Sequence, residues 1–405
     1  MRKIAFDVLR KVIVDHKYAN VALKNVDHPN VALITQLVYG TLQNYEYCKA
    51  HWQPFISKPL KKDIEILLTL SVYQWIFIDK TPDYAIVNET IEIAKRLFDG
   101  RYQKVINAVL RNVFLQPILS LPFDTNENIA LMTSFPLWII NLWEKQYGKE
   151  LMLDFALSSN KASTIYVKEN PFVSLLEDDS HLEKTDVQGC YAVDRTFLSS
   201  KAFAFGKYIV QDKNAQQVAH FVDVKPNDVV LDACAAPGGK SVSMAIKMNN
   251  QGKIIALDVF EHRLQLIQQL IRKTKIDIIK PTLQDATKAH EAFKEETFDG
   301  VLVDAPCSGL GVLKRKPEIK LFIKPSDLDQ LVTLQQEILK SVALLVKVGG
   351  WLVYSTCTIN KKENEKQSEY FLNKFPQYEK IEEKFINPKT SEADGFYMVK
   401  YKRTS

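Results

Sequence analysis

Apolar residues recur at helical spacing through the first third of the chain. The stretches 64–75, 86–97 and 105–110 carry an apolar residue at about every third or fourth position. The N-terminal stretch has the same pattern at Ile4, Val8, Leu9, Val12 and Ile13. Such recurrence is typical of helices that bury one face. Glycines are few and strand-like alternation is missing, so we predict a compact all-α domain over residues 1–120.

The helical pattern changes in the middle of the chain. Residues 115–130 contain two prolines and many polar residues, which is typical of a linker. An aromatic-rich stretch with helical spacing follows at 135–155, and residues 160–205 mix short β-like runs such as "STIYV" and "CYAV" with polar turns. We therefore expect a linker and a small α+β module over residues 121–205.

From Gly206 onward, short apolar runs alternate with amphipathic helices. The runs are "VVLDA", "IIALD", "IIKPTL", "GVLVDAP" and "WLVYSTC". Apolar runs without polar alternation, separated by helices, indicate a parallel sheet that is buried on both faces. We predict a doubly wound, Rossmann-like α/β domain over residues 206–405, with its ligands beyond the carboxyl ends of the strands.

Composition and charge narrow the class of protein. With 46% hydrophobic and 25% charged residues, the chain has an ordinary globular composition. The net charge of +5 comes from residues 1–120, where 16 Lys and Arg stand against 11 Asp and Glu. A mild positive bias of this kind fits nucleic-acid contact but is also common among other enzymes.

Cysteine usage and hydropathy indicate the compartment. Five cysteines in 405 residues do not make a disulfide framework. The uncharged stretch Ile129 to Trp143 has 15 residues, whereas a membrane span needs about 20 mostly apolar residues. The N-terminus lacks the continuous apolar core of a signal peptide. We expect a soluble cytoplasmic protein with no membrane partner.

The loop Asp232 to Ser241, "DACAAPGGKS", follows the first apolar run and ends in two glycines, a lysine and a serine. A phosphate-binding P-loop needs the pattern G-x-x-x-x-G-K-[ST], but Cys234 stands at its first glycine and Pro237 lies inside the loop. A dinucleotide-binding loop needs three spaced glycines, and only Gly238 and Gly239 are available. Both phosphate-binding patterns are therefore incomplete.

S-adenosylmethionine fits this loop better because it has no phosphate groups. Such a ligand needs a tight strand-to-helix turn and an acidic residue that binds the ribose hydroxyls at the end of the next strand. Asp258 ends "IIALD" 19 residues after Gly239, close to the spacing of about 20 expected for that acid. Asp285 follows the third run and could contact the adenine amino group, although by itself it is more typical of a helix cap.

Three cysteines, Cys234, Cys307 and Cys357, lie where apolar runs end. A lone cysteine is usually a small buried hydrophobic residue. Two cysteines beyond neighbouring strand ends, with Asp304 and a methyl donor nearby, suggest a specific chemistry. A thiolate that adds to carbon 6 of cytosine makes carbon 5 nucleophilic enough to take a methyl group. Metal binding is the rival, but the chain has no CxxC pair and no His at ligand spacing, so we expect no metal.

Several of these stretches resemble a known family. "CAAPGGK", "DAPCSGLG", "RKPEIK" and "GGWLVYSTCTINKKENE" are similar to the signatures of the RNA cytosine-C5 methyltransferases of the Sun/Fmu (NOL1/NOP2/Sun) class. "LVYGTLQN", "VYQWIFI", "AIVNETIEIAK" and "VINAVLRN" resemble the NusB-like RNA-binding domain that is fused to the bacterial RsmB branch. Gln43 in "GTLQN" stands where family members often have Arg. The resemblance implies a multidomain protein with an all-α NusB-like domain, a small α+β RNA-contacting module and a Rossmann-like methyltransferase domain.

The resemblance also implies roles for individual residues. Cys357 is the nucleophile, Cys307 assists release of the product, and Asp304 touches both the target base and the cofactor. Lys240 reaches the base or the carboxylate of the cofactor. The residues implied to bind S-adenosyl-L-methionine are Cys234, Ala235, Ala236, Pro237, Gly238, Gly239, Lys240, Asp258, Asp285 and Asp304.

The implied substrate is a cytosine in 16S ribosomal RNA, free or in the assembling small subunit, bound by a monomer. The basic run "LKRKPEIK" follows the Cys307 loop, and we expect its Lys314, Arg315 and Lys316 to contact phosphates, although charge runs are more often solvated faces. The target base must leave its stack to reach a thiol, so a single-stranded or looped target is expected. A P-loop NTPase and a non-catalytic RNA-binding factor are the alternatives.

Asn360 and Glu363 have the spacing of a capping box, in which a polar residue is followed three positions later by Glu. We interpret this pair as the structural start of a helix after Cys357.

Overall fold

The structure, a computed structural model, describes residues 1–78, 81–175, 182–389 and 392–405. The chain folds into two compact units. The first, here called the helical unit, comprises Met1–Lys161 and Leu313–Ile323. The second, the α/β unit, comprises Ala162–Val312 and Lys324–Ser405. These limits differ from the expected ones, because residues 121–205 are divided near residue 161 and a short segment of the C-terminal region folds with the N-terminal helices.

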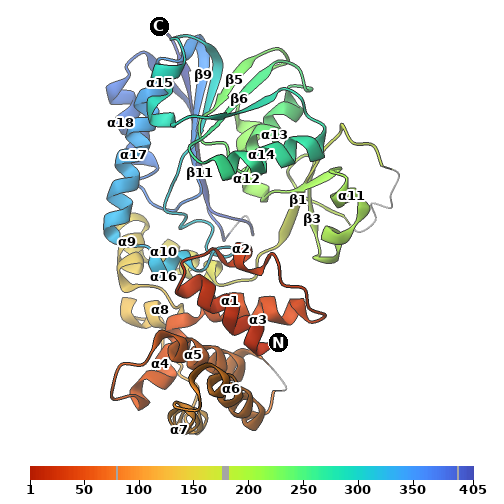
Figure 1. Ribbon diagram of the computed structural model, residues 1–405. Coiled ribbons are helices and arrows are strands. Elements are labelled where there is room, and N and C mark those ends of the chain that lie inside the picture. The colour runs from red at the N-terminus through yellow and green to blue at the C-terminus, as the bar shows by residue number, and fades with distance from the viewer. Residues whose placement is uncertain (79–80, 176–181, 390–391) are drawn as a thin grey trace. The chain divides into compact units, whose positions relative to one another are not determined.

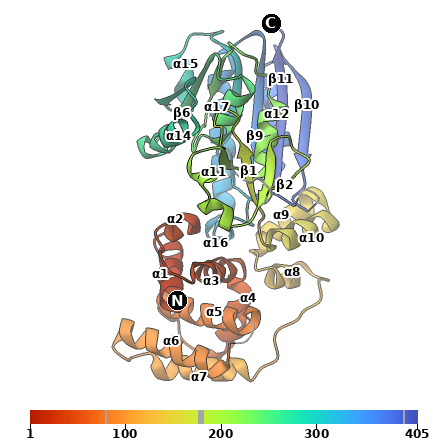
Figure 2. The same ribbon diagram turned by 90° about the vertical axis from the view of Figure 1, so that its right-hand side faces the viewer.

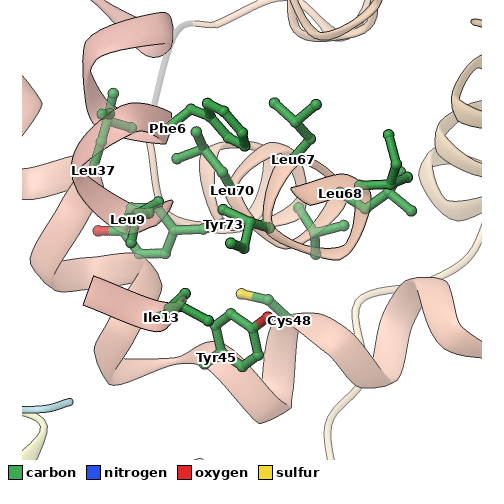
Figure 3. Packing of buried hydrophobic residues seen from close by; sticks show 14 of the residues in the cluster. Phe6, Leu9, Ile13, Leu37, Tyr45, Cys48, Leu67, Leu68, Leu70 and Tyr73 are labelled. Atoms are coloured by element: carbon green, nitrogen blue, oxygen red, sulfur yellow. The ribbon is translucent and has the colours of Figure 1, made fainter. Parts of the chain in front are cut away.

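The helical unit confirms the predicted all-α domain (Figure 1). Its core surrounds α5 (Lys62–Phe77), which is buried on nearly every side, as expected for a helix that is apolar all round. Figure 3 shows α5 residues such as Leu67 and Tyr73 together with Phe6 of α1 (Arg2–Ile13). The other elements of this unit are α2 (Ala19–Leu23), α3 (Val31–Gln43), α4 (Tyr45–Trp52), η1 (Gln53–Phe55), α6 (Asp83–Phe98), α7 (Gln103–Phe114), α8 (Asn126–Met132), α9 (Leu137–Tyr147), α10 (Lys149–Ser159) and α16 (Ile319–Phe322).

Two residues show how closely these helices pack. A side chain at Gly40 in α3 would overlap the ring of Tyr73, so only glycine permits this approach of α3 to α5. Cys48 in α4 is fully buried, and burial raises the pKa of its thiol well above the usual value. Cys48 is therefore an unreactive part of the core.

The α/β unit begins with a small antiparallel sheet in the strand order β2-β3-β1-β4. Its strands include the predicted runs "STIYV" and "CYAV", now placed in β1 and β3. The elements of this part are β1 (Ile165–Glu169), β2 (Glu183–Lys184), β3 (Cys190–Val193), η2 (Thr196–Ser199), α11 (Lys201–Ala204) and β4 (Tyr208–Val210).

The main sheet has the strand order β10-β11-β9-β8-β5-β6-β7. Strands β9, β8, β5, β6 and β7 are parallel. Strand β11 pairs antiparallel with β9 on one side and with β10 on the other, and Figure 2 shows β9, β11 and β10 side by side. The strands are β5 (Val229–Asp232), β6 (Lys253–Asp258), β7 (Ile279–Leu283), β8 (Phe298–Asp304), β9 (Val346–Thr356), β10 (Tyr378–Ile386) and β11 (Phe396–Arg403). The predicted Rossmann-like domain is confirmed.

Helices cover both faces of this sheet. Val230 and Ile254 pack on one face with the helices α12 and α13, and Leu231 and Ile255 pack on the other with α17 and α18. Burial of successive residues on opposite faces explains why these strands read as uninterrupted apolar runs. The helices are α12 (Lys213–Phe221), α13 (Gly239–Lys247), α14 (Glu261–Thr274), η3 (Ala286–Lys288), α15 (Ala289–Ala292), α17 (Pro325–Ala343) and α18 (Glu365–Lys374).

The strand order reverses at the pair β5 and β8, which is the switch point where ligands of doubly wound sheets bind. Within the described ranges, no helix is both long and apolar enough to cross a lipid bilayer.

Candidate active site

The glycine loop links the end of β5 to the start of α13. The amide of Gly238 donates to the carbonyl of Ala235 at 2.8 Å, and Gly238 has φ 105°, a conformation that favours glycine. A side chain at Gly238 would also press on Ile267 of α14. Beneath the loop, buried Asp232 accepts a hydrogen bond from Ser241 at 2.6 Å, and burial raises the pKa of Asp232 to about 7. The loop is thus a tight turn that leaves room for a ligand to meet backbone.

Asp258 lies at the end of β6, next to this turn, and is 5% exposed. Its carboxylate accepts from the amide of Phe260 at 3.1 Å and pairs with Arg263 at 3.2 Å. Arg263 also donates to the carbonyl of Ala236 in the glycine loop at 3.3 Å. One guanidinium therefore fixes the acid and the loop together, and sequence reasoning missed this residue because an exposed helix arginine carries no local signal.

Asp285 follows β7 and is exposed. It accepts from the amide of Thr287 at 2.9 Å and from the Thr287 hydroxyl at 2.8 Å, which makes it the cap of η3. The capping role that the sequence left open is therefore present, and contact of Asp285 with a ligand stays a prediction.

The two cysteines of interest meet at the ends of β8 and β9. These strands are parallel neighbours with Asp304 opposite Ser355, so the residues that follow them lie side by side. The sulfur atoms of Cys307 and Cys357 are 3.3 Å apart, and neither cysteine forms a disulfide. Cys234 lies apart from this pair and packs against the apolar core, and burial raises the pKa of its thiol. This environment agrees with the usual role of a lone cysteine as a small hydrophobic residue.

Asp304 and Lys240 form an ion pair beside the thiols. The ammonium group of Lys240 lies 2.6 Å from one carboxylate oxygen of Asp304, and Ser355 donates to the other oxygen at 2.9 Å. Burial works to lower the pKa of Lys240, but the carboxylate of Asp304 outweighs it and the pKa is raised. Lys240 therefore stays a cation, and Cys357 is among the neighbouring groups that interact with its charge.

Glu363 joins the loops that carry the two cysteines. It accepts hydrogen bonds from Ser308, which follows Cys307, and from Asn360. The prediction that Asn360 and Glu363 start a helix as a capping box was wrong, because α18 begins only at Glu365 and Asn364 is its N-cap residue. The pair is structural, as expected, but it holds the active-site loops.

The basic run after the Cys307 loop folds into the helical unit. Lys314 is 6% exposed, and its carbonyl accepts from Gln43 at 3.4 Å. Glu318 is buried and accepts from the amide of Ala19 at 3.0 Å. The position of Lys314 does not fit a lysine that extends into solvent toward a phosphate. Arg315 and Lys316 are half-buried, and their contact with RNA stays a prediction.

Lys320, the last residue of this run, is also deeply buried. It is 2% exposed, and its ammonium group donates to the carbonyls of Gln43 at 2.6 Å and Thr133 at 3.2 Å. It also donates to the side chain of Asn160 at 3.0 Å and lies over the ring of Phe135. Burial lowers the pKa of Lys320 to about 7. The segment Leu313–Ile323 is therefore part of the core of the helical unit.

Among the described residues, no group of three or more His, Cys, Asp or Glu side chains is arranged so that it could hold a metal ion.

Comparison with known proteins matches both the N-terminal and the C-terminal region of the chain to protein families. Residues 219–402 match the family described as "16S rRNA methyltransferase RsmB/F", and residues 1–114 match the NusB family. The chain is 36% identical to the "Probable ribosomal RNA small subunit methyltransferase B" of Bacillus subtilis (strain 168), over 94% of this chain and 89% of that protein.

Two solved structures are similar. The first, described as "Crystal Structure of PH0851", has a TM-score of 0.86 and 26% identity, and covers 100% of this chain and 99% of its own. The second, "The crystal structure of NSun6 from Pyrococcus horikoshii with SFG", has a TM-score of 0.61 and 18% identity, and covers 67% of this chain and 99% of its own. At that identity the second structure supports the fold alone.

Proposed function

The chain belongs to the RsmB/F family of 16S rRNA methyltransferases, and we propose that it methylates carbon 5 of a cytosine in that RNA through a covalent bond between Cys357 and carbon 6. The observation that carries this proposal is the 3.3 Å separation of the Cys307 and Cys357 sulfurs beside Asp304. Membership of a methyltransferase family sets aside the two alternatives, a P-loop NTPase and a non-catalytic RNA-binding factor.

The chemistry of cytosine explains why two thiols are useful. Carbon 5 of the free base is a poor nucleophile, and addition of the Cys357 thiolate to carbon 6 places an electron pair on carbon 5. After methylation, the proton on carbon 5 leaves, the carbon 5–carbon 6 double bond reforms, and the Cys357 sulfur departs as a thiolate. Cys307 lies in contact with Cys357, where it can assist this release.

Asp304 and Lys240 are the polar groups that face the same space. Ser355 and Lys240 occupy both carboxylate oxygens of Asp304 and so fix its orientation. A fixed carboxylate next to the thiols can accept a hydrogen bond from the amino group of a cytosine and so hold the ring in place for the adduct. Lys240 balances the negative charge of Asp304 and favours a thiolate at Cys357.

S-adenosyl-L-methionine would supply the methyl group. The residues proposed to bind it are those of the turn 234–240, with Asp258 on the ribose and Asp285 near the adenine. The tight turn at Gly238 and the acid that Arg263 orients at the end of β6 fit this ligand. The NSun6 structure, which is similar in fold, was determined with SFG, an S-adenosylmethionine analogue.

Bisulfite sequencing tests the proposal directly. Purified protein is incubated with unmethylated 16S rRNA, or with small-subunit assembly intermediates, in the presence of S-adenosylmethionine. The proposal expects one cytosine to become resistant to conversion, and the same cytosine to lose this resistance in cells that lack the gene. A methyl group found on another atom or another base would overturn the proposal, and reactions without S-adenosylmethionine serve as the control.

A further inference from the structure

Glu363 is a carboxylate buried in the α/β unit, with 0% exposure. One of its oxygens accepts from the Ser308 amide at 2.9 Å and from the Gln335 side chain at 3.1 Å. The other accepts from the Ser308 hydroxyl at 2.5 Å and from the Asn360 side chain at 2.9 Å. These four donors are neutral groups. Hydrogen bonds satisfy both oxygens of Glu363, but no cation among its recorded contacts in the described residues neutralises it.

The same contacts anchor the chain on both sides of Cys307. Ser308 follows Cys307 directly, and the Gln335 side chain that meets Glu363 also donates to the carbonyl of Pro306 at 2.9 Å. The Ser308 hydroxyl lies 2.6 Å from the hydroxyl of Thr358, the residue after Cys357. Glu363 therefore fixes the loop that holds the two sulfurs 3.3 Å apart.

The charged groups recorded near Cys307 are acids, whereas the charged group recorded near Cys357 is the ammonium group of Lys240. Cys307 interacts with Cys357, with the two acids Glu363 and Asp304, and with the buried phenol of Tyr354. The hydrogen bond with Cys357 is the largest cause that raises the pKa of Cys307, followed by burial and the nearby negative charges. Cys357 instead interacts with the ammonium group of Lys240. When one proton is shared between the thiols, this arrangement favours keeping it on Cys307.

We propose that Glu363 is a positioning residue that selects Cys357, and not Cys307, as the nucleophile. Its hydrogen bonds fix the Cys307 loop, and its negative charge opposes a thiolate at Cys307 while leaving Cys357 free to ionise beside Lys240. The mechanistic meaning of this selection rests on the function proposed above. The selection itself is a property of the protein without RNA or cofactor.

Alkylation by iodoacetamide tests the selection, because only the thiolate reacts at an appreciable rate. The full-length protein is alkylated over a range of pH, and peptide mass spectrometry gives the rate at each cysteine. In the wild type we expect Cys357 to react well before Cys307 as the pH rises. In Glu363→Gln, which keeps the size of the side chain but removes its charge, we expect the ratio of the two rates to fall on the order of tenfold.

Two further variants separate charge from structure. Glu363→Asp keeps the charge but shortens the side chain, so the preference for Cys357 should survive even where methyl transfer slows. Glu365→Gln removes a half-buried carboxylate two residues away that makes no recorded contact with the Cys307 loop, and it should leave the ratio unchanged. If Glu363→Gln does not fold, Glu363→Asp still tests the inference, because a lost preference for Cys357 with the charge retained would contradict it.

An unchanged rate ratio in folded Glu363→Gln, or a lost preference in Glu363→Asp, would overturn the inference whatever the activity. A shifted ratio supports it, even if the wild-type protein proves not to methylate cytosine. The two proposals can therefore fail separately.

Discussion

The loop 304–312 and the segment 313–323 are adjacent in the chain, yet they belong to different compact units. In the loop, the acid Asp304 and the thiol Cys307 lie at the candidate active site. Ser355 donates a hydrogen bond to Asp304, and Glu363 accepts one from the residue after Cys307. In the segment, the charged residues Glu318 and Lys320 are buried among the helices. Polar residues that are close in sequence therefore have different roles. Those of the loop 304–312 contribute reactive groups, whereas those of the segment 313–323 anchor the chain in the helical unit.

This difference teaches that a charged side chain does not reveal its own environment. A lysine run beside a catalytic loop indicates phosphate contact on charge alone. Lys320 instead has three oxygen acceptors and an aromatic ring around it, which is how a buried cation is accommodated. Experiments can therefore separate residues of the loop, which should affect chemistry, from residues of the segment, which should affect stability.

The largest expected effect on methyl transfer comes from replacing Cys357, whose thiol contacts Cys307 of the loop. Cys357→Ala removes the proposed nucleophile, and we expect methyl transfer to 16S rRNA to fall by at least about 10³-fold while RNA binding persists. A radiolabelled methyl-transfer assay measures the loss. Cys190→Ser, in the small sheet, serves as the control and should stay active. Full activity of Cys357→Ala would exclude the proposed mechanism.

Cys307, in the loop itself, should act later in the reaction. We expect Cys307→Ala to form the bond between Cys357 and the base but to release the product slowly. A covalent protein–RNA complex should then accumulate and survive denaturing gel electrophoresis. The double variant Cys307→Ala/Cys357→Ala should form no such complex, and a persistent complex in that variant would show that another residue carries the adduct.

Lys320 tests the segment. Lys320→Met keeps most of the apolar stem but leaves three oxygen acceptors without their donor, and we expect a loss of about 2–4 kcal/mol in the free energy of unfolding. Thermal unfolding measures it, with the exposed Lys104→Met on α7 as a control that should change little. A loss of activity in folded Lys320→Met as large as that of Cys357→Ala would break the division between the two regions.

The pH dependence of stability gives Lys320 a second signature. Burial lowers the pKa of Lys320 to about 7 from its usual 10.5, so between these values the unfolded state binds more protons than the folded state. The free energy of unfolding should therefore rise with pH from about 7 towards 10.5 through this group, and the rise should be absent below pH 7. Chemical denaturation at several pH values checks the sign, and Lys320→Met should lack this contribution.

The smallest effect is expected at the half-buried residues of the segment. If Arg315 and Lys316 each contact a phosphate, replacing both with Gln should weaken RNA binding severalfold and lower the salt dependence of the affinity by up to about two charges. Filter binding at several salt concentrations measures the slope. Lys314→Met should leave the slope unchanged because Lys314 is buried, and a slope that falls with Lys314→Met would contradict the buried position.

The sequence could predict the elements and the strand ends. Apolar runs that end in Asp258, Asp304 and Cys357 indicate parallel strands, and parallel strands bring their carboxyl ends to one edge. The proximity of Cys307 and Cys357 follows from that rule, although their positions are 50 residues apart. The limits of the compact units could not be predicted in this way, because the chain divides near residue 161 and Leu313–Ile323 folds with the N-terminal helices.

The supporting residues could not be predicted in the same way. Arg263 and Glu363 act through contacts with residues distant in sequence, and neither has a pattern that distinguishes it from an ordinary helix arginine or a capping glutamate. Burial of Lys314 and Lys320 depends on which helices surround them. Gln43, where the family often has Arg, bonds this segment, and only the structure connects the two observations.

The segment Leu313–Ile323 folds with the N-terminal helices, and this has a consequence for folding during protein synthesis. Gln43, Thr133 and Asn160 leave the ribosome well before Lys320, so the helical unit cannot complete its core until more than three quarters of the chain has been translated. Until then, the apolar surface that Leu321 and Phe322 later cover is open to solvent or to a chaperone. The helical unit is therefore completed only late in translation, and a gene truncated after residue 161 would encode helices that lack a piece of their own interior.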